Sequence, residues 1–174
     1  MNIKVPAIFL LLAVAVFQAS FGWMAAIYGI RPSLTLISVY ALAIIGGEGR
    51  GIFYGTVGGL AEDCLSGGMM GVFTSGYAIV GFLAGRMGKR VFNIGETANF
   101  MGMFSLSLVQ GLYIAVIMNT FIEGYDFLGG TLRFALPQAI YNAVAGTGVL
   151  WLFKKSIASR VPWLKTIRHI KVQL

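Results

Sequence analysis

The chain has 174 residues, of which 57% are hydrophobic and only 11% charged, and its formal net charge is +7. Soluble proteins carry about 25% charged residues, so this composition excludes an ordinary soluble domain. The basic residues lie at the ends of apolar runs and near the C-terminus, where they orient a membrane protein, and this argues against nucleic-acid binding. The composition therefore predicts an all-α integral membrane protein.

Six apolar stretches are expected to span the membrane as helices. They are, in chain order, Val5–Ile27, Ser33–Gly47, Gly51–Leu65, Gly68–Gly85, Asn99–Ile122 and Phe134–Phe153. The first is longer than the roughly 7–15 residues of a signal-peptide core, which indicates an uncleaved span. The second and third are shorter than the ~20 residues that a straight crossing needs. Either they lean on neighbours where the bilayer is thinner, or they form one helical hairpin with its turn at Glu48-Gly49-Arg50.

The distribution of basic residues predicts the orientation. With the N-terminus in the cytoplasm and six spans, 11 of the 13 lysines and arginines fall in inner segments, and only Arg31 and Arg133 fall outside. Such an excess of basic residues is typical of cytoplasmic loops, so both termini are expected in the cytoplasm. Residues 1–153 would form one transmembrane domain. The longest inner loop is expected from Arg86 to Ala98, and the longest outer loop from Glu123 to Arg133.

Residues 154–174 are expected to form a basic amphipathic cytoplasmic tail. Pro162 is well placed to open a helix. The apolar residues at helical spacing are Trp163, Leu164, Ile167, Ile170 and Leu174. Such a helix is typical of adsorption to a membrane surface, and docking of a cytoplasmic partner is the alternative.

Small residues at four-residue spacing form ridges on three of the predicted spans. They are Gly51, Gly55 and Gly59 on the third, Gly81 and Gly85 on the fourth, and Ala15 and Ala19 on the first. Such ridges let helix backbones approach closely in lipid. Packing within the protein is the expected role of the glycines. A docking surface for another membrane protein is the alternative, and it suits Ala15 and Ala19 better because end helices are often peripheral.

Asp63 stands at the end of the third span, before a turn that contains Ser66, two glycines and Gly71. Its carboxylate is expected to accept hydrogen bonds from the amides that start the fourth helix. Proton or ion coupling is the alternative for Asp63. The neighbouring Glu62 is expected to be a solvated residue at the membrane interface.

Polar side chains inside the fifth and sixth spans are expected to join these helices. Gln110 and Asn142 come to similar depth when the two spans run antiparallel, and a hydrogen bond between them would be worth about 0.6–2 kcal/mol. Pro137 is expected to kink the sixth helix near its outer end.

The sequence offers no pattern for catalysis or for a cofactor. The only histidine is His169, in the tail, and the only cysteine is Cys64. No residues have the spacing of metal ligands or of a nucleophile and its base, so we expect neither an enzyme nor a bound metal.

Three segments in a fixed order resemble the rod shape-determining protein MreD family of bacteria. They are Arg31-Pro32-Ser-Leu-Thr-Leu, the stretch from Gly59 to Gly71 that contains Glu-Asp63-Cys-Leu-Ser66, and Gly76-Tyr-Ala-Ile-Val-Gly81-Phe-Leu-Ala-Gly85-Arg86. The resemblance covers residues 31–92, and the remainder agrees in length and hydropathy. It implies a non-enzymatic inner-membrane scaffold of the elongation machinery that organises lateral peptidoglycan synthesis. Its implied partners are an MreC-like periplasmic coiled-coil protein and, through that complex, actin-like MreB, RodA and a class B penicillin-binding protein.

A second resemblance implies a different function. The short helix opened by Pro32, the glycine ladder and the Ala15–Ala19 pair are also similar to the substrate-binding subunits of energy-coupling-factor vitamin transporters. The transmembrane domain is therefore expected to be a glycine-rich bundle like those subunits. Against vitamin capture, the outer segments offer few groups for a ligand, namely Tyr28, Arg31, Tyr125 and Arg133.

Overall fold

The structure, a computed structural model, describes residues 4–26, 29–94 and 96–157. All the regular elements in these ranges are helices. The long helices are α1 (Lys4–Phe21), α2 (Leu34–Gly46), α3 (Glu48–Ser66), α4 (Val72–Ile94), α5 (Glu96–Phe121) and α7 (Leu136–Ile157). The short elements are η1 (Gly22–Ala25), α6 (Phe127–Gly130) and η2 (Thr131–Ala135), of which η2 is a π-helix. The six expected spans thus correspond to six long helices.

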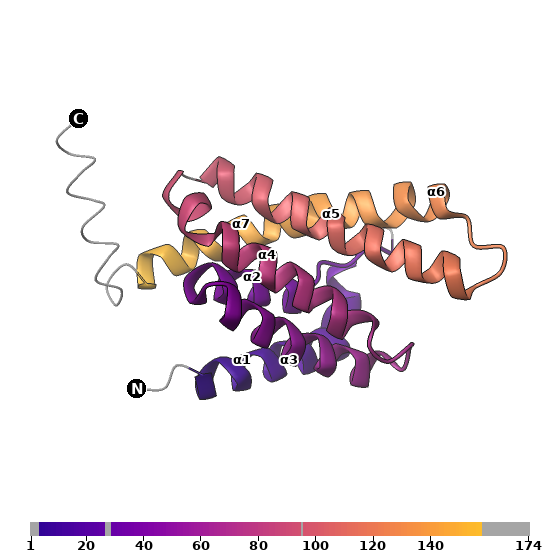
Figure 1. Ribbon diagram of the computed structural model, residues 1–174, viewed down its shortest axis with the longest axis horizontal. Helices are drawn as coiled ribbons and strands as arrows, with labels where there is room; N and C mark the ends of the chain where they lie inside the picture. The colour runs from indigo at the N-terminus through magenta and orange to yellow at the C-terminus, as the bar shows by residue number, and fades with distance from the viewer. Residues whose placement is uncertain (1–3, 27–28, 95, 158–174) are drawn as a thin grey trace.

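The helices run along the long axis of the molecule, as Figure 1 shows. Helices α5 and α7 lie together on one side, and α1 and α3 lie on the other. The turns after α3 and α5 lie at the end opposite the N-terminus. One buried cluster joins α2, α4, α5 and α7 around Tyr40, Tyr77 and Met103, and a second joins α1, α2 and α3 around Leu11 and Val39.

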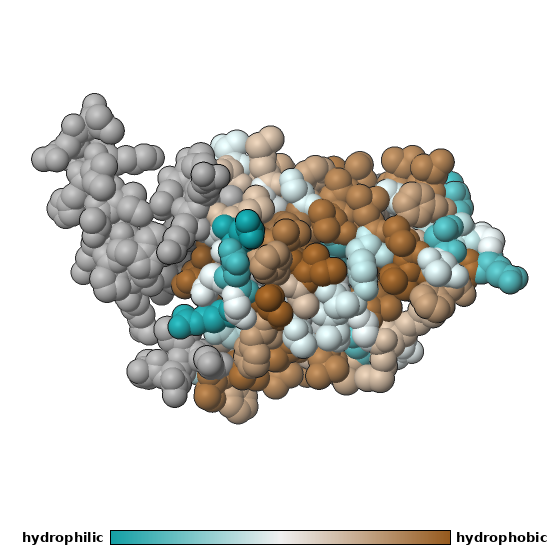
Figure 2. All heavy atoms as spheres, in the orientation of Figure 1, coloured by the Kyte–Doolittle hydropathy of each residue, from teal (hydrophilic) through white to brown (hydrophobic). Residues whose placement is uncertain are grey.

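The surface has the apolar character that lipid contact requires. In Figure 2 hydrophobic side chains cover much of the visible face, and hydrophilic side chains gather toward its ends. Large apolar side chains are exposed along α1, including Phe9 and Phe17, and along α5, including Met101 and Val116. Two of the described helical segments, Val5–Met24 and Glu96–Phe121, are long and apolar enough to cross a membrane, whereas the apolar α2 is shorter.

Helix α2 can be short because neighbouring helices cover much of its surface. Its 13 residues span about 20 Å, well short of the ~30 Å hydrocarbon core of a bilayer. More than half of them are buried, and it packs against α1, α3, α4 and α7. Ser33 caps its N-terminus, since the Ser33 hydroxyl accepts a hydrogen bond from the Leu36 amide at 3.3 Å. The short second span therefore leans on neighbouring helices.

Helices α2 and α3 also form a tight hairpin. Gly47 alone separates them, with a φ of +83° that favours glycine. The turn expected at Glu48-Gly49-Arg50 is wrong, because these residues are the first turn of α3, which runs to Ser66.

Close backbone contact joins α3 to α4 along the predicted glycine ridge. A Cβ atom added to Gly51 would overlap the carbonyl oxygen of Gly81, and one added to Gly55 would overlap the carbonyl group of Tyr77. A Cβ atom added to Gly59 would overlap the carbonyl group of Phe73, and one added to Gly85 would lie 2.6 Å from the carbonyl group of Gly47. The two helices are antiparallel here, so each step of four residues forward along α3 corresponds to a step of four residues backward along α4. The glycines of both ridges pack inside the protein.

The fourth helix differs from the prediction at both ends. Residues 67–71 form a turn, with positive φ at Gly67 and Gly71, so α4 starts at Val72 and not at Gly68. It then continues to Ile94, through most of the inner loop expected from Arg86 to Ala98. An amphipathic helix with basic residues on its polar side can continue beyond the apolar core, and hydropathy alone does not mark its end.

A continuous helical segment leads into the last long helix. Asp126 caps α6 by accepting a hydrogen bond from the Gly129 amide at 2.9 Å, so the expected outer loop ends there and not at Arg133. Helix η2 follows, and the Leu136 amide bonds to the carbonyl of Thr131. Pro137 lacks an amide hydrogen, and the irregular π-turn falls just before it. Helix α7 then runs to Ile157, past the expected end at residue 153, and the rest of the tail lies outside the described residues.

Candidate functional site: a polar network around Glu62 and Ser33

Asp63 ties the end of α3 to the start of α4. One carboxylate oxygen accepts the Phe73 amide at 3.0 Å, and the other accepts the amides of Gly71 and Thr74, both at 2.9 Å. That second oxygen also accepts the Thr74 hydroxyl at 2.5 Å. The side chain is only 2% exposed. These are the hydrogen bonds to the start of the fourth helix that the sequence predicts, and they hold the turn closed.

The turn itself is organised by glycine conformation and by Ser66. Gly67 ends α3 in the left-handed region, with a φ of +64°, and Gly71 has a φ of +96°. The Ser66 hydroxyl donates to the carbonyl of Asp63 and accepts the Gly68 amide, at 3.3 and 3.4 Å. Ser66 and Gly71 therefore shape the turn that brings the α4 amides onto Asp63.

Glu62 lies at the edge of a buried polar network, and the expectation of a merely solvated residue is wrong. One carboxylate oxygen accepts the Gln18 side-chain amide at 2.5 Å, and the other accepts the Tyr77 hydroxyl at 3.2 Å. The side-chain oxygen of Gln18 in turn accepts the Thr35 amide at 3.0 Å. Glu62 thus links α1, α3, α4 and the start of α2.

The network continues from Tyr77 across the centre of the bundle. The hydroxyls of Tyr77 and Ser33 share a hydrogen bond of 2.8 Å. The Ser33 amide donates to the side-chain oxygen of Asn142 at 2.7 Å, and the Asn142 amide group donates to the Ser107 hydroxyl, also at 2.7 Å. A continuous chain of hydrogen bonds therefore runs from Gln18 through Glu62 to Ser107, and it joins α1, α3, α4, α7, α5 and the N-cap of α2.

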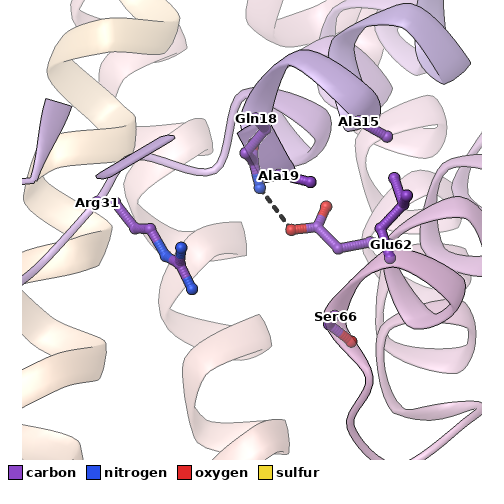
Figure 3. A pocket seen from close by; sticks show the side chains of 7 residues that line it. Ala15, Gln18, Ala19, Arg31, Glu62 and Ser66 are labelled. Atoms are coloured by element: carbon purple, nitrogen blue, oxygen red, sulfur yellow. Dashed lines mark hydrogen bonds between the residues drawn. The ribbon is translucent and has the colours of Figure 1, made fainter. Parts of the chain in front are cut away.

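Two cavities open beside this network. One of about 240 Å³ is lined by Ala15, Gln18, Ala19, Arg31, Glu62, Leu65 and Ser66. The other, of about 230 Å³, shares Gln18, Arg31 and Glu62 and reaches Phe73, Tyr77, Phe134 and Gln138. Figure 3 shows the first cavity, with Arg31 and Glu62 extending into it from opposite sides. Within the described part of the chain, no ion pair joins these two charges.

The expected hydrogen bond between Gln110 and Asn142 is absent among the described residues. Asn142 bonds to Ser107 instead, one turn before Gln110 on α5. Gln110 is 5% exposed, and neither side-chain polar atom has a described partner. It lies against Gly76, where an added Cβ would come within 2.5 Å of the Gln110 oxygen. The similar depth of residues on two antiparallel spans therefore predicted that Asn142 contacts α5, but it did not predict which α5 residue is the partner.

The alanine pair on α1 does not act as one ridge. Ala15 is buried at 3% exposure, whereas Ala19 is exposed, and both line the cavity between α1 and α3. The glycine ridges, in contrast, are occupied by the α3–α4 contact. Of the predicted small-residue ridges, only the end near Ala19 is open to another molecule.

Four residues of the network were not singled out from the sequence: Gln18, Ser33, Tyr77 and Ser107. A signal was available for two of them. Ser33 follows Pro32 at the start of a predicted helix, which is a typical capping position, and Gln18 interrupts an apolar span. Tyr77 gives no such signal, because an aromatic residue in an apolar helix is ordinary. Its role depends on the close α3–α4 approach.

The chemistry of this site is hydrogen bonding and charge recognition. Among the described residues no group of three or more histidine, cysteine or acidic side chains could hold a metal ion. The network offers one carboxylate, one exposed guanidinium and several neutral amides and hydroxyls. Such an arrangement can fix helices relative to each other and can recognise a small polar group.

The family model described as rod shape-determining protein MreD matches residues 2–157. No curated protein and no solved structure matches the chain.

Proposed function

The chain belongs to the MreD family of rod shape-determining membrane proteins, and on this basis we propose that it is a non-enzymatic scaffold of the bacterial elongation machinery. It would sit in the inner membrane and help to organise lateral peptidoglycan synthesis. The observation that carries the proposal is the family match over residues 2–157. The vitamin-transporter alternative has no support from the comparisons.

The architecture suits a role as a rigid membrane platform. The glycine contact between α3 and α4, the four hydrogen bonds to Asp63 and the network through Ser33 fix the helices to one another. Lipid-facing side chains on α1 and α5 leave broad apolar surfaces for lateral contact. In membranes, such contacts depend on packing and interhelical hydrogen bonds.

The proposed partners follow from the family. They are an MreC-like periplasmic coiled-coil protein and, through that complex, actin-like MreB, RodA and a class B penicillin-binding protein. The chain itself would contact these partners through its helices within the membrane, because the described residues form a single helical bundle.

Depletion of the protein in a rod-shaped host is expected to give rounded, widened cells. Cell width by microscopy is the measurement, and re-expression of the chain should restore the rod. The same strain should show no vitamin requirement, and an MreC-like protein should co-purify with the tagged chain. Cells that keep their width after depletion would contradict the scaffold role, and tight recovery of a vitamin would favour the transporter.

Labelling of single cysteines is expected to place both termini in the cytoplasm. Cys64 is exposed and is first replaced by Ala. A cysteine inserted after Met1, and cysteines at Glu96 and Leu174, should react with an impermeant maleimide only after the cells are opened, whereas one at Asp126 should react in intact spheroplasts. This result follows from the 11-to-2 distribution of basic residues. Labelling of Leu174 from outside would overturn the six-span topology.

A further inference from the structure

The cavity between α1 and α3 is lined by two opposite charges, Arg31 and Glu62, which no described salt bridge joins. Glu62 receives hydrogen bonds only from neutral groups, the Gln18 amide and the Tyr77 hydroxyl. Arg31 extends into the same space from the opposite wall, and no described ion pair joins it to Glu62 (Figure 3). A charge that is partly withdrawn from water, as Glu62 is, gains from an opposite charge beside it. A group that carries both charges would pair them at once.

The polar groups define what such a ligand must carry. Glu62 can accept hydrogen bonds from a primary ammonium group, and Arg31 can donate to a phosphate in the planar geometry that suits its guanidinium. Gln18 and Ser66 also line the cavity and supply further neutral polar atoms. The volume of about 240 Å³ corresponds to roughly eight water molecules, and it is smaller than the roughly 300–1,000 Å³ of sites for drug-sized ligands.

We propose that this cavity binds the headgroup of a phospholipid that carries both a phosphate and a primary ammonium, such as phosphatidylethanolamine. The ammonium lies at Glu62 and the phosphate at Arg31. This assignment rests on the cavity and its charges, and it is independent of the proposed partners in wall synthesis.

The position of the cavity favours a lipid over a dissolved molecule. Gln18 lies little more than one helical turn before Trp23, which is 69% exposed, and exposed tryptophans mark the membrane interface. The rim between α1 and α3 includes Ala19 and Leu65, which are exposed and apolar. Acyl chains can therefore lie along the apolar outer face of α1 while the headgroup enters the cavity.

Native mass spectrometry of the full chain in detergent tests the assignment. The protein is titrated with phosphatidylethanolamine, phosphatidylcholine and phosphatidylglycerol of identical acyl chains. Phosphatidylethanolamine should bind about tenfold more tightly than either of the others, because a trimethylammonium cannot donate to Glu62 and a glycerol headgroup has no cation. Equal binding of the three lipids would overturn the proposal.

Charge-removing variants locate the site. Glu62→Gln should lower phosphatidylethanolamine binding by about tenfold and abolish its preference over phosphatidylcholine and phosphatidylglycerol, because the ammonium loses its acceptor. Arg31→Gln should lower the binding of all three lipids by about tenfold, because each of them carries the phosphate that Arg31 holds. The matched controls are Arg133→Gln and Glu123→Gln, which remove the same charges from exposed positions and should leave binding unchanged. Because Glu62 is part of the network, its variant could misfold. Arg31 is exposed, so Arg31→Gln decides without that risk, and unchanged affinity for all three lipids in that variant would refute the site.

Competition with free phosphoethanolamine distinguishes a lipid headgroup from a water-soluble ligand that carries the same phosphate and ammonium groups. At millimolar concentration it should displace little bound lipid, since the apolar contacts of the acyl chains are lost. Complete displacement at that concentration would show that the cavity takes its ligand from water, and it would overturn the lipid assignment.

Discussion

Replacement of Gly55 by Leu is expected to remove most of the folded protein. A single Cβ at this position already overlaps the backbone of Tyr77, so no rotamer change relieves the clash, and α3 must move away from α4. Overpacking of a core typically costs about 1–3 kcal/mol, and we expect a cost at or above the upper end because two backbones must separate. The amount of monodisperse protein in detergent and its thermal midpoint measure the effect.

Gly49→Leu is the matched control for this variant. Gly49 lies on the same helix, it is exposed, and an added Cβ would meet nothing within 4 Å. The control should accumulate like the parent protein. If Gly55→Leu also accumulates normally but fails to restore cell shape, the ridge serves a partner and the internal packing has been misjudged.

Replacement of Asp63 by Ala is expected to destabilise the protein strongly. It removes the acceptor of four hydrogen bonds and leaves the amides of Phe73 and Thr74 without their partner. Loss of an ordinary N-cap costs about 0.5–2 kcal/mol, and we expect at least the upper end of that range. The thermal midpoint in detergent is the measurement.

The Asp63→Asn variant separates geometry from charge. Asparagine keeps one acceptor oxygen, but its amide group faces a donor where the second carboxylate oxygen stood, so the effect should be intermediate and not mild. Asp126→Ala is the matched control, because this exposed carboxylate caps only the four-residue α6. Normal folded yield of Asp63→Asn with complete loss of shape complementation would refute the capping role and favour proton or ion coupling.

The sequence was sufficient to predict the elements whose signals are local. Hydropathy located all six long helices, four-residue glycine spacing indicated close packing within the protein without naming the partner helix, and an acidic residue before a glycine-rich turn indicated the Asp63 hydrogen bonds. Each of these depends on residues close together in the chain. The family, too, was evident from short motifs, and the family match confirms it.

The polar network could not be derived in this way, because its members are far apart in sequence. Ser33 meets Asn142 across 109 positions, and Gln18 meets Glu62 across 44. Which side chains meet depends on the rotation of each helix about its axis. A hydropathy pattern with exposed apolar residues on every lipid-facing side does not define that rotation. The choice of Gln110 in place of Ser107 as partner of Asn142 was wrong for this reason.

The single-residue link at Gly47 has a consequence for how the protein enters the membrane. Helix α2 is too short to span a bilayer alone. Because only Gly47 separates it from α3, α2 is not expected to insert into the membrane before α3. Helix α3, rich in glycine, is itself stabilised by its contact with α4. We therefore expect these three helices to leave the insertion machinery as one unit, held there until Ile94 has been synthesised. Chains that stall earlier would expose their glycine ridge to membrane proteases.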